Sequence, residues 1–405
     1  MNPSPEMVML LKIRMWTPDI QCDYTRMIDR IHYLQRLSIA TDRSPVTALL
    51  GPRQCGKTTL ARLFAQQHST HYFDLESAAD QQRLQNPELM LGQLQGMVIL
   101  DEIQIKPELF NVLRILADRP EGHLKFLILG SASPHIMQHV SETLAGRVEF
   151  IELSGFNLGE TTEIQRLWLR GGFPRSFLAH SEADCQVWRD GFIRTFLERD
   201  IPMLGIRIAP AAMRRFWTML AHFHGQTWNA SELGRSMGLT DKTVRSYLDI
   251  LTSTFMIRQL QPWHENLHKR QVKAPKIYFR DSGLLHNLLN IPDYHSLTGN
   301  PRLGASWEGF AMEQVLQALR PSAAYFWSTY SGAEVDLLSS RIRTSSYPIV
   351  QHFVGDPFFL QLPFGLFVTI EVDTCCIGKI RRKLDEQWSK VCIHQIEVIL
   401  IAQHR

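Results

Sequence analysis

The sequence contains few cysteines, and their spacing suits neither a zinc site nor a disulfide framework. Only six of the 405 residues are cysteine, no two of them form a C-x-x-C pair, and Cys55 lies within a glycine-rich motif. Regularly spaced cysteines would be expected in both kinds of site. We therefore expect the chain to work in a reducing compartment, the cytoplasm.

Long apolar runs and a strong net charge are also lacking. The stretch MVMLLKI near the start is too short to cross a bilayer, and it has neither the charged leader nor the cleavage pattern of a secretory signal. We expect no membrane partner. The formal charge of +3 does not by itself indicate nucleic-acid binding, but local basic patches leave that open. With 44% hydrophobic and 20% charged residues, the composition is that of a globular protein of two or three domains.

A glycine-rich motif interrupts an apolar segment between residues 46 and 64. The segment VTALLGPRQCGKTTLARLF predicts a buried strand, a G-x-x-x-x-G-K-[ST] loop and an amphipathic helix. Such a loop turns backbone N–H groups inward at a helix N-terminus, while Lys57 supplies a positive charge and Thr58 a hydroxyl for Mg²⁺. We predict that Lys57 also acts in catalysis. The predicted ATP-binding residues are Gly51, Pro52, Arg53, Gln54, Cys55, Gly56, Lys57, Thr58 and Thr59.

A second motif, GMVILDEIQ, ends a short apolar run with two acids, Asp101 and Glu102. The run has the composition of a buried parallel strand. Ligands gather at the carboxyl ends of strands in open α/β sheets. There Asp101 is expected to hold Mg²⁺ and Glu102 to polarise the attacking water. The two motifs together predict an Mg²⁺-dependent ATPase.

Short apolar strands alternate with amphipathic helices over residues 29–160, after an N-terminal extension of residues 1–28. This order predicts an α/β fold, a P-loop NTPase parallel sheet with helices on both faces. Ser131 follows another core strand and is either a sensor of the γ-phosphate or a turn residue. Arg147 precedes the last strand. It either reaches the γ-phosphate of a neighbouring subunit, which requires a homo-oligomer, or is a solvated or carboxylate-paired arginine.

Residues 161–295 have a largely helical pattern. Two short helices around MGLTD, with Thr240 as N-cap of the second, are typical of a helix-turn-helix, and FMIRQLQPW and PKIYFRD then predict two strands and a wing. We predict a winged-helix domain that either contacts double-stranded DNA or binds a partner protein. The candidate DNA contacts are Lys242, Thr243 and Arg245 on the second helix and His268, Lys269, Arg270 and Lys273 on the wing.

Residues 296–405 begin with a helical pattern at SWEGFAMEQVLQAL and continue with strand patterns at AAYFWSTYSGAEVDLLS, LFVTIEVD and QIEVILIAQ. A helix is predicted at IRRKLDEQWSK, and residues 340–363 have no clear pattern. Three acids, Glu308, Asp336 and Glu371, come from a helix and two strands. They are either oxygen ligands for Mg²⁺ in a phosphodiester-cleaving site or unrelated surface acids.

The order of these motifs resembles a family of prokaryotic AAA-like P-loop ATPases related to the archaeal-type ATPases, with a C-terminal domain of unknown function that looks like a restriction endonuclease. The resemblance runs from about residue 29 to residue 338 and rests on GPRQCGKTTLAR, FDLES, ILDEIQ, ILGSAS, LAGRV, LSGFNLGE, GGFPR, RDI, KTVRSYLDIL, KIYFRDSGLL, WEGFAMEQ and SGAEVDLL. It implies ATP binding by residues 51–59, Mg²⁺ and water handling by Asp101 and Glu102, sensing by Ser131 and a finger role for Arg147. A winged helix between the ATPase and the restriction-endonuclease-like domain is also implied.

The C-terminal segment departs from the pattern of this family. Related restriction-type folds place a lysine two residues after the acid of the second strand, where it positions the water and screens developing charge. This chain has Asp373 at that position, and Lys379 lies on the following segment. Either Lys379 substitutes or the domain no longer cleaves DNA. We favour the loss of cleavage.

The leading hypothesis is an ATPase whose nucleotide state drives the winged-helix and nuclease-like domains to act on DNA or on a DNA-bound partner. The alternative is a signalling or defence switch, in which nucleotide exchange controls contacts with a partner protein. A kinase using the same loop is disfavoured because no small-molecule acceptor site is evident in the sequence.

Overall fold

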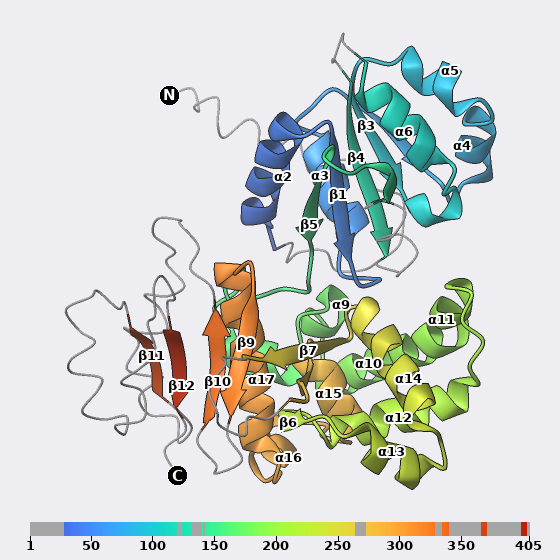
Figure 1. Ribbon diagram of the computed structural model, residues 1–405. Coiled ribbons are helices and arrows are strands. Elements are labelled where there is room, and N and C mark those ends of the chain that lie inside the picture. The colour runs from blue at the N-terminus through green and yellow to red at the C-terminus, as the bar shows by residue number, and fades with distance from the viewer. Residues whose placement is uncertain are drawn as a thin grey trace, which may run out of the picture.

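A computed structural model of the chain describes residues 28–119, 124–131, 140, 142–263, 273–328, 334–339, 366–370 and 398–402. These residues form an amino-terminal lobe and a second lobe, which lies below it in Figure 1. Across the described residues, no helix combines the length and the apolarity that a membrane crossing requires.

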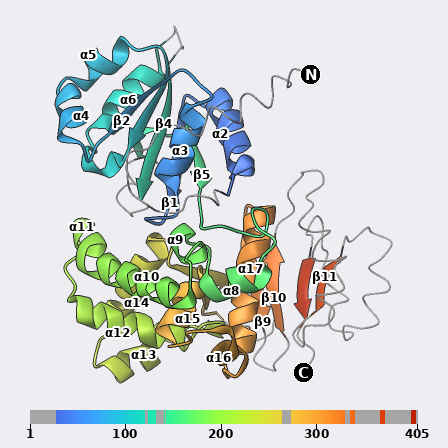
Figure 2. The same ribbon diagram turned by 180° about the vertical axis from the view of Figure 1, so that it is seen from behind.

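The first lobe is a five-stranded parallel sheet of order β2-β3-β4-β1-β5 with helices on both faces. This confirms the predicted α/β fold with a parallel sheet. Figure 2 views the face covered by α2 and α3. The elements are α2 (Ile31–Arg43), β1 (Val46–Gly51), α3 (Lys57–Ala65), β2 (Thr70–Asp74), α4 (Ala78–Arg83), α5 (Pro87–Gly92), β3 (Gly96–Asp101), the 3₁₀ turn η1 (Ile103–Ile105), α6 (Leu109–Ala117), β4 (Leu124–Ser131) and β5 (Val148–Glu152).

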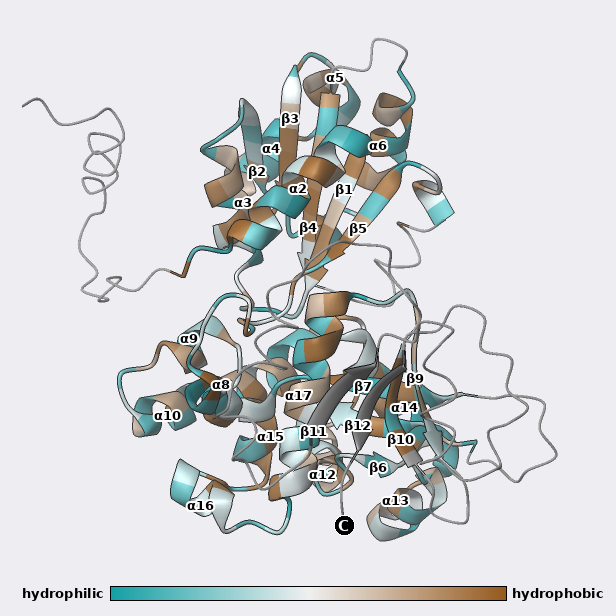
Figure 3. Ribbon diagram, turned by 90° about the vertical axis from the view of Figure 1, so that its left-hand side faces the viewer, coloured by the Kyte–Doolittle hydropathy of each residue, from teal (hydrophilic) through white to brown (hydrophobic). Residues whose placement is uncertain are grey.

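Alternate side chains of the central strands belong to two different cores. Leu49 and Leu127 pack in the core with α2 and α3, whereas Ala48 and Ile128 pack in the core with α5 and α6. Every residue of β1 is buried. Figure 3 accordingly shows β1 and β4 largely in the hydrophobic colour. A strand covered on both faces reads as a continuous apolar run, which is why this sheet is visible in the sequence.

The second lobe joins a group of helices to a five-stranded mixed sheet of order β10-β9-β7-β8-β6. A further pair of antiparallel strands, β11 and β12, lies beside β10 (Figure 1). The elements are α8 (Ile164–Arg170), α9 (Pro174–Phe177), α10 (Glu182–Thr195), the π-helix η2 (Phe196–Asp200), α11 (Ile201–Met203), α12 (Pro210–Ala221), β6 (Gln226–Thr227), α13 (Ala230–Met237), α14 (Asp241–Ser253), β7 (Ile257–Pro262), β8 (Lys276–Phe279), α15 (Ser282–Leu288), α16 (Tyr294–Thr298), α17 (Leu303–Leu319), β9 (Ala324–Ser328), β10 (Glu334–Ser339), β11 (Leu366–Ile370) and β12 (Val398–Ala402).

One sheet crosses the domain boundary that we predicted between residues 295 and 296. Strand β7 pairs antiparallel with β8 and parallel with β9, and β9 pairs antiparallel with β10. The two strands predicted to flank the wing therefore lie in the same sheet as β9 and β10, which we had assigned to the next domain. The winged-helix and restriction-endonuclease-like assignments stay predictions.

In the segment that links the lobes, the backbone of residues 155–156 packs directly against the backbone of Gly172. The N–H of Phe156 donates to the carbonyl of Gly172 at 2.6 Å. A Cβ atom on Gly172 would lie 2.4 Å from the carbonyl oxygen of Phe156, and one on Gly155 would lie 2.4 Å from the carbonyl carbon of Gly172. These two positions therefore have no room for a side chain.

We expect Gly172→Ala to destabilise the protein by about 1–3 kcal/mol, because the added methyl group collides with backbone that cannot rotate away. Gly191→Ala is the matched control. Gly191 is exposed on α10 with no atom within 4 Å of an added Cβ, so alanine should stabilise the helix by about 0.5–1 kcal/mol. Urea unfolding midpoints measure both effects, and equal midpoints for the two variants would contradict this packing.

Candidate nucleotide site

The glycine-rich loop connects the buried strand β1 to helix α3. A Cβ on Gly51 would lie 2.1 Å from the carbonyl oxygen of Leu153, so β1 and the segment after β5 touch only because residue 51 is glycine. Gly56 has a φ of 97°, in the left-handed region that glycine tolerates best, and it precedes the first residue of α3. The loop thus ends at a helix N-terminus, where backbone N–H groups lack partners within the helix.

Lys57 and Thr58 begin α3 and contact different parts of the site. Lys57 is 5% exposed, and its ammonium donates to the carbonyls of Gly51 and Pro52 at 3.1 and 2.8 Å. The Thr58 hydroxyl donates to Oδ2 of Asp101 at 2.8 Å. The structure therefore brings together the glycine-rich loop and the first acid of the strand β3, as the two motifs predict.

Tyr72 of β2 also donates to Oδ2 of Asp101, at 2.5 Å. Burial and the hydrogen bond to Asp101 raise the pKa of the Tyr72 phenol, which stays protonated as a donor. Asp101 is 3% exposed, and its carboxylate accepts hydrogen bonds from two neighbouring elements, α3 and β2. Tyr72 was not predicted from the sequence, although Asp74 of its strand pairs in register with Asp101, which places both strand ends at one edge.

Glu102 and Ser131 lie at the same carboxyl edge and share a contact. Glu102 has a φ of 56°, and its N–H donates to Oδ1 of Asp101 at 3.0 Å. The side-chain amide of Gln104 donates to the Glu102 carboxylate and, at 3.3 Å, to the hydroxyl of Ser131. Ser131 is in register with Gly51 at the end of β4. Gln104 thus joins the two side chains predicted to act on water and on the γ-phosphate.

The other predicted loop residues differ in exposure. Pro52 and Cys55 are buried, and the Cys55 thiol lies 3.5 Å from the carbonyl of Leu153. Gln54, with a φ of 61°, and Thr59 are exposed. Arg53 is 16% exposed and forms an ion pair with Asp200 of the second lobe.

Arg30, which was not predicted from the sequence, binds the backbone of the glycine-rich loop. It precedes α2, is 5% exposed and donates to the carbonyls of Cys55, Ser154 and Gly155, each at 3.1 Å. Its Nε and Nη2 pair with the Glu160 carboxylate at 2.5 and 3.0 Å. Burial opposes the charge, but Glu160 holds the pKa of Arg30 above its usual value. One guanidinium therefore connects α2, the glycine-rich loop and the segment that leads to the second lobe.

Arg147 lies far from the loop of its own chain. It precedes β5, and β5 runs parallel to β1 with Val148 beside Val46. The glycine-rich loop follows the other end of β1, and a strand of five residues spans about 16 Å. Arg147 pairs instead with Asp118 at 2.6 Å, and this hydrogen bond lowers the pKa of Asp118. The finger role stays a prediction, and it requires the site of a neighbouring subunit.

The predicted helix-turn-helix region consists of α13 and α14. The Thr240 hydroxyl accepts from the N–H of Thr243 at 3.2 Å, so Thr240 caps α14 as expected. Lys242 and Arg245 are exposed on α14, Thr243 is half-buried, and Lys273 is exposed before β8. His268, Lys269 and Arg270 lie outside the described residues.

Two of the three predicted C-terminal acids meet at a lysine. The ammonium of Lys276, on β8, lies 2.9 Å from Oδ1 of Asp336 and 3.6 Å from Oε1 of Glu308. Tyr278 donates to the same Glu308 carboxylate. Glu371, Asp373 and Lys379 lie outside the described residues. Where side chains are described, no group of three or more His, Cys, Asp or Glu residues is arranged to hold a metal ion.

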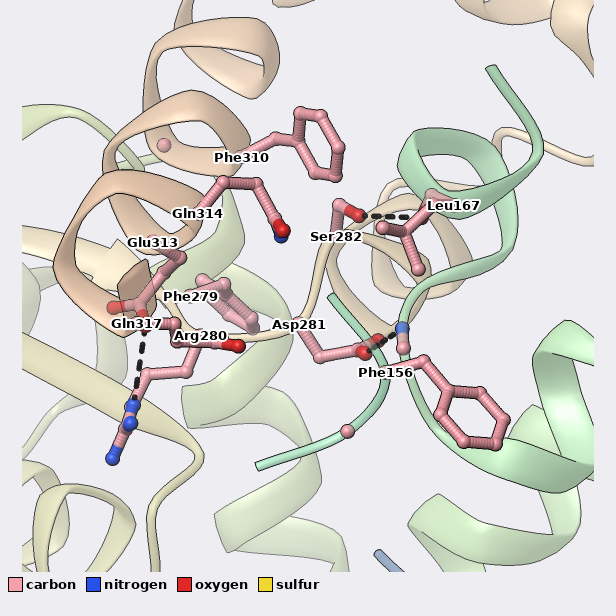
Figure 4. A pocket seen from close by; sticks show the side chains of 13 residues that line it. Phe156, Leu167, Phe279, Arg280, Asp281, Ser282, Phe310, Glu313, Gln314 and Gln317 are labelled. Carbon is pink, nitrogen blue, oxygen red and sulfur yellow. Dashed lines mark hydrogen bonds and ion pairs between the residues drawn. The ribbon is translucent and has the colours of Figure 1, made fainter. Parts of the chain in front are cut away.

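A cavity lies at the junction of the lobes, and its lining includes no residue of the glycine-rich loop (Figure 4). Asp281 lies at its wall and accepts from the N–H groups of Gly172 and Leu284 at 2.7 and 2.9 Å. Burial raises the pKa of Asp281. Arg280, beside it, pairs with Glu152 at the end of β5 and lies 3.6 Å from Glu313 of α17. The cavity wall therefore contains ionic contacts between the lobes.

Comparison with known proteins identifies the first lobe. Residues 43–162 match a family described as AAA domain, and residues 161–295 match a domain of unknown function, DUF8612. The chain is 52% identical over 313 residues to the uncharacterized protein Rv2008c of Mycobacterium tuberculosis. The aligned region covers 77% of this chain and 71% of that protein. The uncharacterized protein Mb2031c of Mycobacterium bovis matches with the same identity and coverage. A solved structure, the Walker-type ATPase PABY2304 of Pyrococcus abyssi, aligns with a TM-score of 0.46 and 14% identity over 66% of this chain and 97% of that chain.

The amino-terminal lobe is thus a P-loop ATPase domain of the AAA type, which confirms that part of the prediction. The chain belongs to the same family as the two mycobacterial proteins.

Arg30→Met should lower the free energy of unfolding by about 3–5 kcal/mol, because it leaves the buried Glu160 carboxylate without its counter-charge. Glu160 is 3% exposed as a side chain. Arg43→Met is the control, since Arg43 is 64% exposed and its ion pair with Glu149 should contribute less than about 1 kcal/mol. Thermal or urea unfolding compares the two variants. A loss of unfolding free energy no larger for Arg30→Met than for Arg43→Met would contradict the role of Arg30 in connecting α2, the loop and the segment that leads to the second lobe.

Proposed function

We propose that the chain binds ATP with Mg²⁺ at residues 51–59, hydrolyses it, and uses the cycle to rearrange the second lobe on DNA or on a DNA-bound partner. The AAA match supports the nucleotide chemistry. The observation that carries the proposal is the hydrogen bond of 2.8 Å between Thr58 and Asp101. It joins the loop that would hold phosphates to the acid that would hold the cation.

The residues present fit ATP and Mg²⁺. Gly51 and Gly56 leave the loop free of side chains at two points, and α3 offers backbone donors with the positive end of its dipole. Lys57 would exchange the carbonyls of Gly51 and Pro52 for phosphate oxygens. Thr58 and Asp101 supply the hard oxygen ligands that Mg²⁺ prefers.

Different side chains of the protein would then carry out different parts of ATP hydrolysis. Bound Mg²⁺ supplies charge neutralisation between the phosphate groups. Glu102 would orient the attacking water and accept its proton, with its carboxylate fixed by Gln104. Ser131 accepts a hydrogen bond from the same amide. A contact of Ser131 with the γ-phosphate would therefore be coupled to Glu102 through Gln104.

Lys57→Ala should abolish ATP binding and phosphate release, because it removes the loop's point charge. Glu102→Gln should keep ATP binding and lose hydrolysis by about 10²-fold or more. Lys125→Ala is a lysine control, since Lys125 contacts the carbonyl of Asp42 at the opposite edge of the sheet. Phosphate release with ATP and Mg²⁺, measured with equilibrium nucleotide binding, tests all three. Unchanged binding in Lys57→Ala would overturn the proposed site.

The DNA part of the proposal is supported by the exposure of α14. Lys242 and Arg245 lie one turn apart on its outer side, and neither is in an ion pair among the described contacts. α13 precedes this helix and the β7–β8 pair follows it, an arrangement compatible with a winged helix. Side chains of this type on a helix suit contacts with phosphates and base edges in a major groove.

Changing both Lys242 and Arg245 to Glu should weaken double-stranded DNA binding and flatten its dependence on salt, because fewer counterions are released. A double change of Arg43 and Lys125 to Glu alters the net charge equally on the first lobe and should leave DNA binding unchanged. Fluorescence anisotropy at several salt concentrations compares them. Equal binding by the α14 variant would move the assignment of this surface to a partner protein.

We further propose that the C-terminal region does not cleave DNA. Lys276 supports this view because its ammonium already occupies the space between the carboxylates of Asp336 and Glu308 and pairs with both. A buried carboxylate pair with such a counter-charge is a structural ion cluster, and a divalent cation would have to displace the ammonium.

A further inference from the structure

Arg53 of the glycine-rich loop forms an ion pair with the second lobe. Its Nη1 atom lies 2.5 Å from Oδ1 of Asp200, and its Nη2 atom lies 3.7 Å from Oε1 of Glu76, which follows β2. Arg199 also lies 3.7 Å from Glu76. A loop that would hold a polyanion is therefore bordered by two carboxylates, and Arg53 stands between them.

Asp200 is presented to the loop by an uncommon element. It ends the π-helix of residues 196–200, which lies between α10 and α11, and its side chain is 9% exposed. Segments of π-helix are rare and occur frequently at functional sites. The last residue of this π-helix therefore places a carboxylate against Arg53 of the loop.

A triphosphate would compete with Asp200 for the same guanidinium. Arg53 carries five N–H donors in a planar fork that suits carboxylates and phosphates equally. ATP brings several negative charges to the loop, and those charges both attract Arg53 and repel Asp200. Moving Arg53 toward phosphate leaves Asp200 poorly exposed to water and without this counter-charge, which disfavours the present contact of the lobes.

We propose that Asp200 is a specificity-determining residue of the nucleotide site: it competes with the phosphate groups for Arg53, and ATP displaces it more effectively than ADP does. This inference rests on the proposed ATP site. The second lobe thereby lowers the affinity for ATP as long as the contact is formed. By reciprocity, bound ATP weakens the contact between Arg53 and Asp200.

Removing the carboxylate should therefore increase affinity, a result that mere structural damage does not give. Asp200→Asn keeps the shape of the side chain and removes its charge. It should bind ATP at least about fivefold more tightly than the wild type, with a smaller gain for ADP because ADP carries less charge. In an Arg53→Gln background the same change should have no effect, because no guanidinium remains to be released.

Glu198→Gln is the matched control for the charge change. Glu198 belongs to the same π-helix but is 53% exposed and pairs with Arg194, so its nucleotide affinities should stay at wild-type values. Isothermal titration with ATP and ADP in Mg²⁺ compares the variants. Wild-type affinity or weaker binding in Asp200→Asn would overturn the proposal, whereas failure of Lys57→Ala to reduce wild-type binding would overturn the nucleotide site itself.

A measurement on the wild-type protein covers the case in which Asp200→Asn does not fold. Saturating ATP should accelerate amide hydrogen exchange in residues 196–205 relative to ADP, because the contact of Asp200 with the loop is weakened. Exchange in this segment that is equal with both nucleotides, or slower with ATP, would overturn the proposal.

Discussion

The guanidinium of Arg30 is the interaction on which the geometry of the nucleotide site depends. The two glycines of the loop have no side chains to pack, so neighbouring segments must help to fix its backbone. Arg30 does this by binding the carbonyls of Cys55, Ser154 and Gly155 while Glu160 balances its charge. Because burying an unpaired charge is costly, the loop and the linker cannot separate without exposing or neutralising both groups.

The other contacts between the lobes are of two kinds, apolar and ionic. A continuous apolar core runs from Leu49 and Phe64 in the first lobe to Phe192 and Trp217 in the second. Its contribution is not directional. The ionic contacts of Arg53 with Asp200 and of Arg280 with Glu152 are directional, and both start at carboxyl ends of the parallel sheet. Apolar burial thus holds the lobes together, whereas these ion pairs lie at the edge of the sheet where we propose that the nucleotide binds.

The sequence predicted the first lobe well because its signals are local. Buried strands, the glycine spacing and the acids Asp101 and Glu102 each lie within a few residues, and parallel topology then brings them to one edge. Arg30, Tyr72 and Asp200 were missed because their partners are distant in sequence: Arg53 and Asp200 are separated by 147 positions. Gln104 lies only two positions from Glu102, but its second partner, Ser131, is 27 positions away. The RDI segment was noticed, but no local pattern indicates that its aspartate faces the loop. Lys276 likewise gives no hint in the sequence that it meets Asp336.

The sheet that crosses residues 295 and 296 has a consequence for dividing the protein into fragments. A chain ending at residue 295, where the match to DUF8612 ends, would lack β9 and β10. Strand β7 would then lose the partners of Gln261 and Pro262 and become an open edge, and Leu260 would lose the buried Phe326 from its core. Open edges beside exposed apolar groups pair with other chains. Aggregation of such a fragment would report the missing strands and would say nothing about the ATPase.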